Sequence, residues 1–302
     1  MITVDNLSIS YGNIKAVQDF SFFVKEGEIY SLVGPDGAGK TSIMRALCNL
    51  LNPESGTVTI NERSVFEDFD SVKPLIGYMP QSFSLYPDLS VEENLKFFSG
   101  IYGTTGQRYR DKRDYMYTFS NLEPFASRRA GALSGGMKQK LALSCALIHD
   151  PKLLILDEPT TGVDPVSRRQ FWEILAELRD RGVAIIVSTP YMDEVARCDR
   201  GSFIFEGRKL AEGTPPELAA KFEGEIYYLG VEPNSELIDA INSIPGISGQ
   251  RFGAGIHIYL RKGDNPENYR DKLKSAGIEV GQLEKTGAVL EDAFIQLVQK
   301  KQ

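Results

Sequence analysis

Cysteine and histidine are scarce in this sequence of 302 residues, which holds three cysteines and two histidines. Cys48, Cys145 and Cys198 lie far apart and form no Cys-x-x-Cys pair, so neither a disulfide framework nor a zinc site is indicated. His149 and His257 are too few and too widely separated for a histidine metal cluster. We therefore expect a reduced protein without a histidine or cysteine metal centre.

Long hydrophobic runs are also missing. The most apolar stretches, residues 153–156 and 183–187, are about five residues long, whereas a helix that spans a bilayer needs about 20. The first residues lack the basic start and the apolar run of a secretory signal. We expect a protein that is not exported, and any membrane-spanning helices would have to come from a partner.

Positive charge is in the minority, with 34 Lys and Arg residues against 41 Asp and Glu residues and a net charge of −7. A broad nucleic-acid surface needs a basic face, so a nucleic-acid partner is disfavoured. The composition is 42% hydrophobic, 25% charged and 10% aromatic, which is ordinary for a globular protein. The length suits one large domain and one small domain, because single cores stop growing at roughly 250–300 residues.

Short apolar runs bounded by glycine or proline alternate with amphipathic stretches over the first two thirds of the sequence. This alternation is typical of a mostly parallel sheet covered by helices. The start of the chain alternates apolar and polar residues instead, which predicts antiparallel strands beside the parallel sheet. The expected buried strands are 28–33, 75–79, 153–157 and 183–188, and the expected helices are 40–50, 134–149 and 166–180.

An inserted helical subdomain is predicted at about residues 82–133, where strand signals disappear. Ser90 is followed three residues later by Glu93, which is the pattern of a capping box at a helix start. The fold class is therefore α/β, with an antiparallel β subdomain and a helical insert.

The pattern changes again beyond about residue 215, after a turn-rich stretch at 212–216. We predict a first domain over residues 1–214 and a small α+β domain over residues 215–302, with the order β-α-β-β-α-β. Its expected strands are 225–231, 256–261 and 278–283, and its expected helices are 235–244, 266–275 and 290–300.

A phosphate loop is the strongest local motif. Residues 34–41, Gly-Pro-Asp-Gly-Ala-Gly-Lys-Thr, fit the pattern G-x-x-x-x-G-K-[ST] between a predicted strand and a predicted helix. Glycines let the backbone wrap a phosphate chain, and the start of the helix adds partial positive charge. Lys40 would reach the β- and γ-phosphates, and Thr41 would bind Mg²⁺. A glycine-rich turn that merely caps a helix is the alternative, and the flanking elements disfavour it. The expected phosphate contacts are Gly34, Pro35, Asp36, Gly37, Ala38, Gly39, Lys40, Thr41 and Ser42.

Two carboxylates, Asp157 and Glu158, end an apolar strand. Parallel sheets place their sites at the carboxyl ends of the strands, so both should lie beside the phosphate loop. Asp157 suits a Mg²⁺ site, and Glu158 could polarise an attacking water. A pair of solvated acids is the alternative, and the phosphate loop makes it less favoured.

Ser134, Gly135 and Gly136 open a predicted helix. Two glycines permit close approach to an anion, but when this segment is taken alone, simple helix capping by Ser134 is the favoured explanation.

Together these motifs resemble an ABC transporter nucleotide-binding subunit over residues 1 to about 215. In this resemblance Tyr11 stacks on adenine and Gln81 is linked to magnesium. Ser134, Gly135 and Gly136 bind the γ-phosphate that the opposite subunit holds, and Asp164 bridges the two subunits. The matching segments are 11–12 (Tyr-Gly), 34–41, 78–81 (Tyr-Met-Pro-Gln), 133–136 (Leu-Ser-Gly-Gly), 156–160 (Leu-Asp-Glu-Pro-Thr), 162–164 (Gly-Val-Asp) and 188–194 (Ser-Thr-Pro-Tyr-Met-Asp-Glu).

The resemblance implies an ATPase that uses ATP and Mg²⁺ and closes as a head-to-tail dimer, either with a second copy or with a different ABC subunit. Residues 85–94 and 289–294 resemble exporter-type subunits that work with separate permease chains and carry a C-terminal accessory domain. The implied location is the cytoplasmic side of the membrane, held there through the permease. Two alternatives from other classes are a nucleotide sensor that does not hydrolyse ATP and a soluble ABC ATPase of translation or DNA repair.

One residue departs from the family pattern in a way that matters for chemistry. Pro190 stands where the family places a histidine that contacts the γ-phosphate. Proline has no side-chain donor and no backbone N–H, but it suits a helix start, here a helix over 191–197 capped by Ser188 or Thr189. We expect slow hydrolysis through Glu158, either in a homodimer or beside a partner subunit whose site does most of the hydrolysis.

Overall fold

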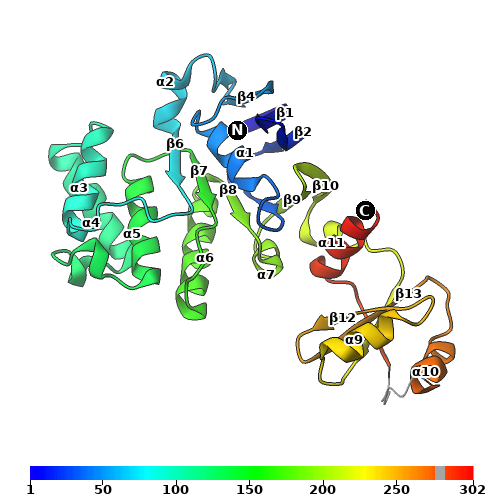
Figure 1. The fold of residues 1–302 in the computed structure, drawn as a ribbon. Helices are drawn as coiled ribbons and strands as arrows, with labels where there is room; N and C mark the ends of the chain where they lie inside the picture. Colours follow the sequence, from blue (N-terminus) through cyan, green and yellow to red (C-terminus); the bar gives the residue numbers. More distant parts are fainter. Residues whose placement is uncertain (276–282, 302) are drawn as a thin grey trace. The chain divides into compact units, whose positions relative to one another are not determined.

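The computed structural model describes residues 1–275 and 283–301 and divides the chain into two compact units, Met1–Pro215 and Pro216–Gln302 (Figure 1). Among the described residues, no helix combines the length and the apolar character that a bilayer crossing requires. The helices of the first unit are α1 (Lys40–Leu47), α2 (Phe69–Val72), α3 (Val91–Ile101), α4 (Gly106–Ser120), α5 (Gly135–Leu147), α6 (Pro165–Asp180) and α7 (Met192–Val195), and α8 (Pro215–Ala219) lies at the boundary of the units.

A six-stranded sheet forms the centre of the first unit, and its order is β10-β9-β3-β8-β7-β6. All neighbouring pairs from β9 to β6 are parallel, whereas β10 is antiparallel to β9. The predicted α/β fold with a mostly parallel sheet is therefore confirmed. The strands are β3 (Ile29–Val33), β6 (Ile76–Met79), β7 (Leu153–Asp157), β8 (Ala184–Thr189), β9 (Arg200–Phe205) and β10 (Arg208–Gly213).

Successive residues of β7 point to opposite faces of this sheet, as the two-residue period of a strand requires. Leu154 and Leu156 belong to the apolar core that contains the buried residues of α5 and α6. Leu153 and Ile155 belong to a second core, which α1 and the antiparallel strands complete. Both faces of the strand are covered, which explains why its sequence is continuously apolar.

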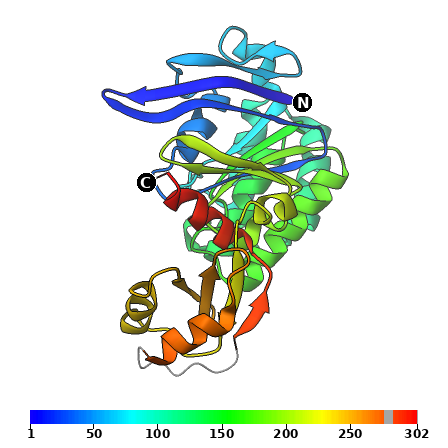
Figure 2. The same ribbon diagram turned by 90° about the vertical axis from the view of Figure 1, so that its right-hand side faces the viewer.

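A second sheet, of order β2-β1-β4-β5, is antiparallel throughout, as expected for the start of the chain. Figure 2 shows its first two strands as a long hairpin. The strands are β1 (Ile2–Tyr11), β2 (Ile14–Val24), β4 (Ser55–Ile60) and β5 (Arg63–Ser64).

Helices α3 and α4 lie between β6 and β7 in the sequence and pack on α5 (Figure 1). The capping box at the start of α3 is present: Ser90 Oγ accepts the Glu93 N–H at 3.1 Å, and Glu93 Oε2 accepts the Ser90 N–H at 2.8 Å. We call residues 82–133 the helical insert. Single 3₁₀ turns cover Lys73–Leu75, Glu123–Phe125 and Ala130–Ala132.

The second unit has its own apolar core. Its described strands form a four-stranded antiparallel sheet of order β12-β13-β11-β14. The predicted strand 278–283 falls outside the described residues except for its last position. The elements are β11 (Glu225–Leu229), α9 (Ser235–Asn242), β12 (Ser248–Phe252), β13 (Gly255–Leu260), α10 (Pro266–Ser275), β14 (Glu284–Thr286) and α11 (Leu290–Gln299).

Candidate nucleotide-binding site

The phosphate loop, residues 34–41, connects β3 to α1, as the motif requires. Gly39 has a φ of +106°, and a Cβ atom there would lie 2.4 Å from the Ala16 carbonyl oxygen, so only glycine fits. The buried Lys40 side chain folds back over the loop, where its ammonium donates to the carbonyls of Gly34 at 2.8 Å and Pro35 at 3.0 Å. The loop therefore surrounds a cation at the start of a helix, which is a favourable place for phosphate.

A cavity of about 340 Å³ opens over this loop. Tyr11 at the end of β1 reaches it, and its hydroxyl lies 3.3 Å from Ser42 Oγ on α1. The cavity has the size of a small-molecule site. Its lining residues are Tyr11, Ala16, Asp36, Gly37, Gly39, Lys40, Thr41, Ser42, Gln81 and Glu158.

Asp157 lies next to the phosphate loop and has one unsatisfied oxygen. Its Oδ1 accepts the Ser188 hydroxyl at 2.6 Å and the Thr41 hydroxyl at 3.2 Å. Within the part of the chain that the structure describes, the buried Oδ2 has no hydrogen-bond partner. Burial raises the pKa of Asp157, and the hydrogen bonds from Ser188 and Thr41 act against this rise. A buried carboxylate with a free oxygen beside a threonine hydroxyl suits a divalent cation such as Mg²⁺.

Glu158 is turned toward the phosphate loop by a strained backbone. Its φ of +48° lies in the left-handed region, which a non-glycine residue rarely adopts. The Glu158 N–H donates to Ser188 Oγ at 2.9 Å. Its carboxylate forms an ion pair with Lys40, 3.2 Å from Nζ to Oε1, and accepts from Gln81 Nε2 at 2.9 Å. The two predicted carboxylates thus lie beside the loop in different environments.

Ser134, Gly135, Gly136 and Asp164 are grouped at the starts of α5 and α6, and none of them lines the cavity over the phosphate loop. Ser134 Oγ caps α5 by accepting the Met137 N–H at 3.4 Å. A Cβ atom at Gly136 would lie 2.4 Å from Ser167 Oγ and 3.7 Å from Asp164 Oδ2.

Asp164 caps α6, because its Oδ1 accepts the N–H groups of Val166 at 3.1 Å and Ser167 at 2.9 Å. The hydrogen bonds from Ser167 lower the pKa of this carboxyl. The predicted site residues therefore form two separate groups within one chain.

The segment after β8 differs from the helix predicted over 191–197. Only one helical turn, α7, forms, with Tyr191 at its N-cap position. Thr189 Oγ1 accepts the Tyr191 N–H at 3.0 Å, and the Thr189 hydroxyl donates to the buried Glu194. Pro190 has no N–H, and the Thr189 hydroxyl and the Tyr191 N–H are both bonded inside the segment.

Glu194 was missed by the sequence analysis. Its carboxylate is 1% exposed and accepts from Thr160, from Thr189 and from Arg168 Nε, the last at 2.7 Å. Ser188, which orients Asp157, was also missed as a site residue. The sequence places Ser188 at the end of a predicted buried strand, which could have indicated a site residue. Only the sheet order, however, shows that it pairs with Asp157 in the neighbouring strand.

A glycine-rich loop between a parallel strand and a helix, with carboxylates at the end of a neighbouring strand, defines a P-loop nucleotide-binding protein. A family model described as ABC transporter matches residues 17–161. Nod factor export ATP-binding protein I of Burkholderia lata is 37% identical over 300 residues, which cover 97% of this chain and 95% of that protein. The chain therefore belongs to the ABC transporter ATP-binding subunits, a family of ATPases.

Other relatives agree with this assignment. The probable multidrug ABC transporter ATP-binding protein YbhF of Escherichia coli is 38% identical over 286 residues, and this chain spans only 49% of its length. A solved ATP-binding subunit of an ABC transporter superposes with a TM-score of 0.67 at 30% identity, covering 74% of this chain and 93% of that one. A dimeric ATP-binding cassette bound to ADP and Pi superposes with a TM-score of 0.65 at 26% identity, covering 71% of this chain and 98% of that one.

Proposed function

We propose that this chain is the ATP-hydrolysing subunit of an ABC exporter and that two subunits close head to tail around ATP. The observation that carries this proposal is the division of the site described above. The cavity with Lys40, Thr41 and Glu158 lacks Ser134 and Gly136, which form a second group around Asp164. Two such chains arranged head to tail would bring the second group of each onto the cavity of the other.

The residues of the cavity suit distinct roles in ATP binding. Lys40 and the loop backbone would hold the β- and γ-phosphates, and Tyr11, which is 45% exposed, offers a ring for stacking on adenine. Thr41, Asp157 and Gln81 would hold Mg²⁺, which would neutralise phosphate charge when bound. Glu158, once released from its contacts, would take a proton from the attacking water.

We assign the permease contact to an exposed apolar patch on the helical insert, made of Tyr86, Phe97 and Ile101, of which Ile101 follows Phe97 by four residues on α3. These side chains are between 40% and 52% exposed, and the rings of Tyr86 and Phe97 pack edge to face with centroids 4.7 Å apart. Exposed apolar patches mark protein contacts. A separate permease would hold the subunit at the inner face of the membrane. The relatives are named for multidrug transport and for Nod factor export, which favours export over translation or DNA repair.

Pro190 supports slow hydrolysis by this subunit's own site. The proline offers no donor toward a γ-phosphate, and the Tyr191 N–H and the Thr189 hydroxyl beside it are bonded within the segment. Glu158 would act without that additional contact. This leaves two arrangements, a slow homodimer or a heterodimer whose partner hydrolyses most of the ATP. It also gives support to the alternative of a nucleotide sensor.

Light scattering on the purified Glu158→Gln variant tests the proposal. With Mg-ATP we expect a stable dimer containing trapped nucleotide, and with Mg-ADP we expect a monomer. The unaltered chain should hydrolyse ATP measurably. A variant that stays monomeric in ATP would contradict the head-to-tail site in a homodimer, and ATP binding without any turnover would favour the sensor.

A further inference from the structure

Glu194 lies where three segments of the first unit meet. Its carboxylate is buried and accepts the Thr160 hydroxyl at 2.5 Å, from the loop after β7, and the Thr189 hydroxyl, from the end of β8. It also accepts Arg168 Nε at 2.7 Å, from the start of α6. A buried carboxylate needs such donors, because an unpaired charge in the interior is strongly unfavourable. The nucleotide-binding roles described above make no use of this group.

Arg168 supplies the cation for this carboxylate. Its side chain is only 25% exposed, so the ion pair is largely shielded from water. The guanidinium also lies over the Tyr191 ring, 4.2 Å from the centroid, and 3.4 Å from Asp193 Oδ2. All three contacts come from residues 191–194, which follow Pro190 directly. The start of α6 is therefore attached to the segment that carries the proline.

The start of α6 also carries part of the second group of site residues. Arg168 lies one helical turn after Asp164, and its N–H donates to the Asp164 carbonyl at 2.9 Å. Ser167, next to Arg168, packs against Gly136, where a Cβ atom would lie 2.4 Å from Ser167 Oγ. A shift of this end of α6 would move Asp164 and displace the start of α5, because packed interiors leave little free space.

Glu194 is connected on its other side to the cavity over the phosphate loop. Thr189 is the neighbour of Ser188, whose hydroxyl oxygen accepts the Glu158 N–H at 2.9 Å. Thr160 lies two residues after Glu158 in the chain. Both the cavity and the second group are thus attached to one buried carboxylate.

We propose that Arg168 and Glu194 are positioning residues that fix the second group relative to the cavity of their own chain. This inference rests on the proposed head-to-tail dimer, in which the second group of one chain completes the site of the other. The ion pair would then connect the two nucleotide sites of a dimer. Since coupling between binding sites is reciprocal, occupancy of either site would influence the other.

Hydrogen exchange of the nucleotide-free protein tests the positioning directly. The Asp164 carboxylate accepts the N–H groups of Val166 and Ser167, so these amides report on the start of α6. In Arg168→Gln we expect them to exchange about tenfold faster or more, because a hydrogen bond to a charged group is lost and this end opens locally. The rise should exceed any rise in β7 and β8. Unaltered exchange at Val166 and Ser167 would overturn the proposal.

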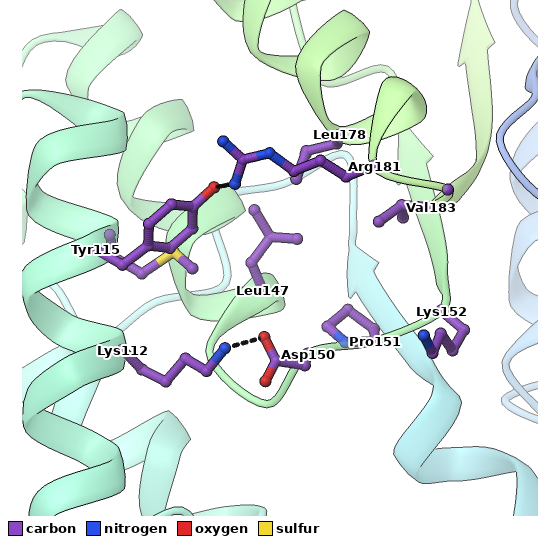
Figure 3. Close-up of a pocket in the computed structure, with 11 residues that line it drawn as sticks. Lys112, Tyr115, Leu147, Asp150, Pro151, Lys152, Leu178, Arg181 and Val183 are labelled. Carbon is purple, nitrogen blue, oxygen red and sulfur yellow. Dashed lines mark hydrogen bonds and ion pairs between the residues drawn. The ribbon is translucent and has the colours of Figure 1, made fainter.

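Arg181 provides a matched control at the other end of α6. It is the C-cap residue of this helix, and its guanidinium lies 5.2 Å from the Tyr115 ring centroid and donates to the Tyr115 hydroxyl (Figure 3). Arg181 precedes β8 whereas Thr189 ends it, so the two arginine contacts lie at opposite ends of this strand. Arg181→Gln should leave exchange at the start of α6 unaltered. Equal acceleration in both variants would count against a specific role of Arg168.

Dimerisation with nucleotide separates positioning from a merely structural role. Both arginine variants are made in the Glu158→Gln background and followed in Mg-ATP by light scattering over a range of protein concentrations. For Arg168→Gln we expect the dissociation constant of the dimer to rise on the order of tenfold, and for Arg181→Gln no change. A dimer as tight as that of the Glu158→Gln parent would overturn the proposal, whatever the melting temperature.

The nucleotide affinity of the single chain is measured alongside, with a fluorescent ATP analogue at protein concentrations that keep the chain monomeric. It should change by less than about twofold in Arg168→Gln, because Arg168 does not line the cavity. A loss of this affinity as large as the loss of dimerisation would place the effect in the cavity and overturn the proposal.

Failure of the proposed dimer can be told apart from failure of this inference. If the Glu158→Gln parent stays monomeric in Mg-ATP, the homodimer is contradicted, whereas exchange at Val166 and Ser167 still decides the positioning. If Arg168→Gln does not fold, Arg168→Lys takes its place, because lysine keeps the charge but lacks the planar group that stacks on Tyr191. Exchange should then be about threefold faster, and no change would overturn the proposal.

Discussion

Lys40 and Glu158 form a buried ion pair across the nucleotide cavity, 3.2 Å from Nζ to Oε1, with side chains only 3% and 6% exposed. In this arrangement the lysine that would hold phosphate is bound to the carboxylate that would activate water. A phosphate chain entering the loop would compete for Lys40 and so release Glu158. The pair would therefore link phosphate binding to the availability of the carboxylate that we propose activates water.

Removing Lys40 should destabilise the nucleotide-free protein, because it leaves Glu158 buried without its cation. We expect Lys40→Met to lower the free energy of unfolding by about 3 kcal/mol. Glu158→Gln should lower the free energy of unfolding by a smaller amount. The double variant should be more stable than the sum of the two single effects predicts, since neither charge then remains. Urea unfolding of the four proteins measures this coupling. Strictly additive effects would show that the two side chains do not interact.

Introducing the missing donor should speed hydrolysis. We expect Pro190→His to raise the steady-state ATPase rate on the order of tenfold or more, because one well-placed donor to a developing charge is worth about 10²–10³ in other enzymes. Pro190→Ala is the control, since it removes the proline ring without adding an imidazole. No gain from histidine, or an equal gain from alanine, would refute the idea that the absent side chain limits the rate.

Ser188 should affect the binding of Mg²⁺ and not the binding of ATP by itself. Ser188→Ala removes the hydroxyl that donates to Asp157 Oδ1 at 2.6 Å. We expect the Mg²⁺ concentration needed for tight ATP binding to rise roughly 10- to 100-fold, as for other residues that orient metal ligands. ATP affinity without Mg²⁺ should stay unchanged in calorimetry.

The same substitution should change the pH dependence of metal binding. Burial already raises the pKa of Asp157, and Ser188 is one of the groups that lower it, so its loss raises the pKa further. Metal binding needs the ionised carboxylate, so the variant should lose Mg²⁺ affinity at a higher pH during acidification. The control is Ser202→Ala, at a buried serine of β9 that forms a hydrogen bond with Tyr30. It should leave the Mg²⁺ affinity and its pH dependence unaltered.

Glu194 should matter for stability far more than its neighbour Asp193. Glu194→Gln keeps the shape of the side chain, but an amide nitrogen cannot accept hydrogen bonds from the hydroxyl and guanidinium donors that contact this position. We expect a loss of about 2 kcal/mol in the free energy of unfolding, within the range for hydrogen bonds to charged groups. Asp193→Asn, at a side chain 68% exposed, should change it by at most about 0.5 kcal/mol. Similar stabilities of the two variants would count against the buried network.

Several elements were predicted from the sequence to the residue, and others ended early for local reasons. The strand 153–157 and the helix 266–275 were predicted with their observed bounds. The helix expected over 40–50 ends at Leu47 because Asn49 adopts a left-handed φ of +52°, which asparagine tolerates. The strand β12 was missed because its sequence, Ser-Gly-Gln-Arg-Phe, is polar and it lies at a sheet edge.

The sequence by itself determined the phosphate loop and the carboxylates at the strand end, because both depend on backbone geometry over a few consecutive residues. Only the tertiary structure decided which side chains meet there. The order of β7 and β8 pairs Ser188 with Asp157, and the side chain of Gln81, which follows β6, meets Glu158, which follows β7. These relationships depend on strand order and packing between distant segments, and local sequence patterns do not specify either.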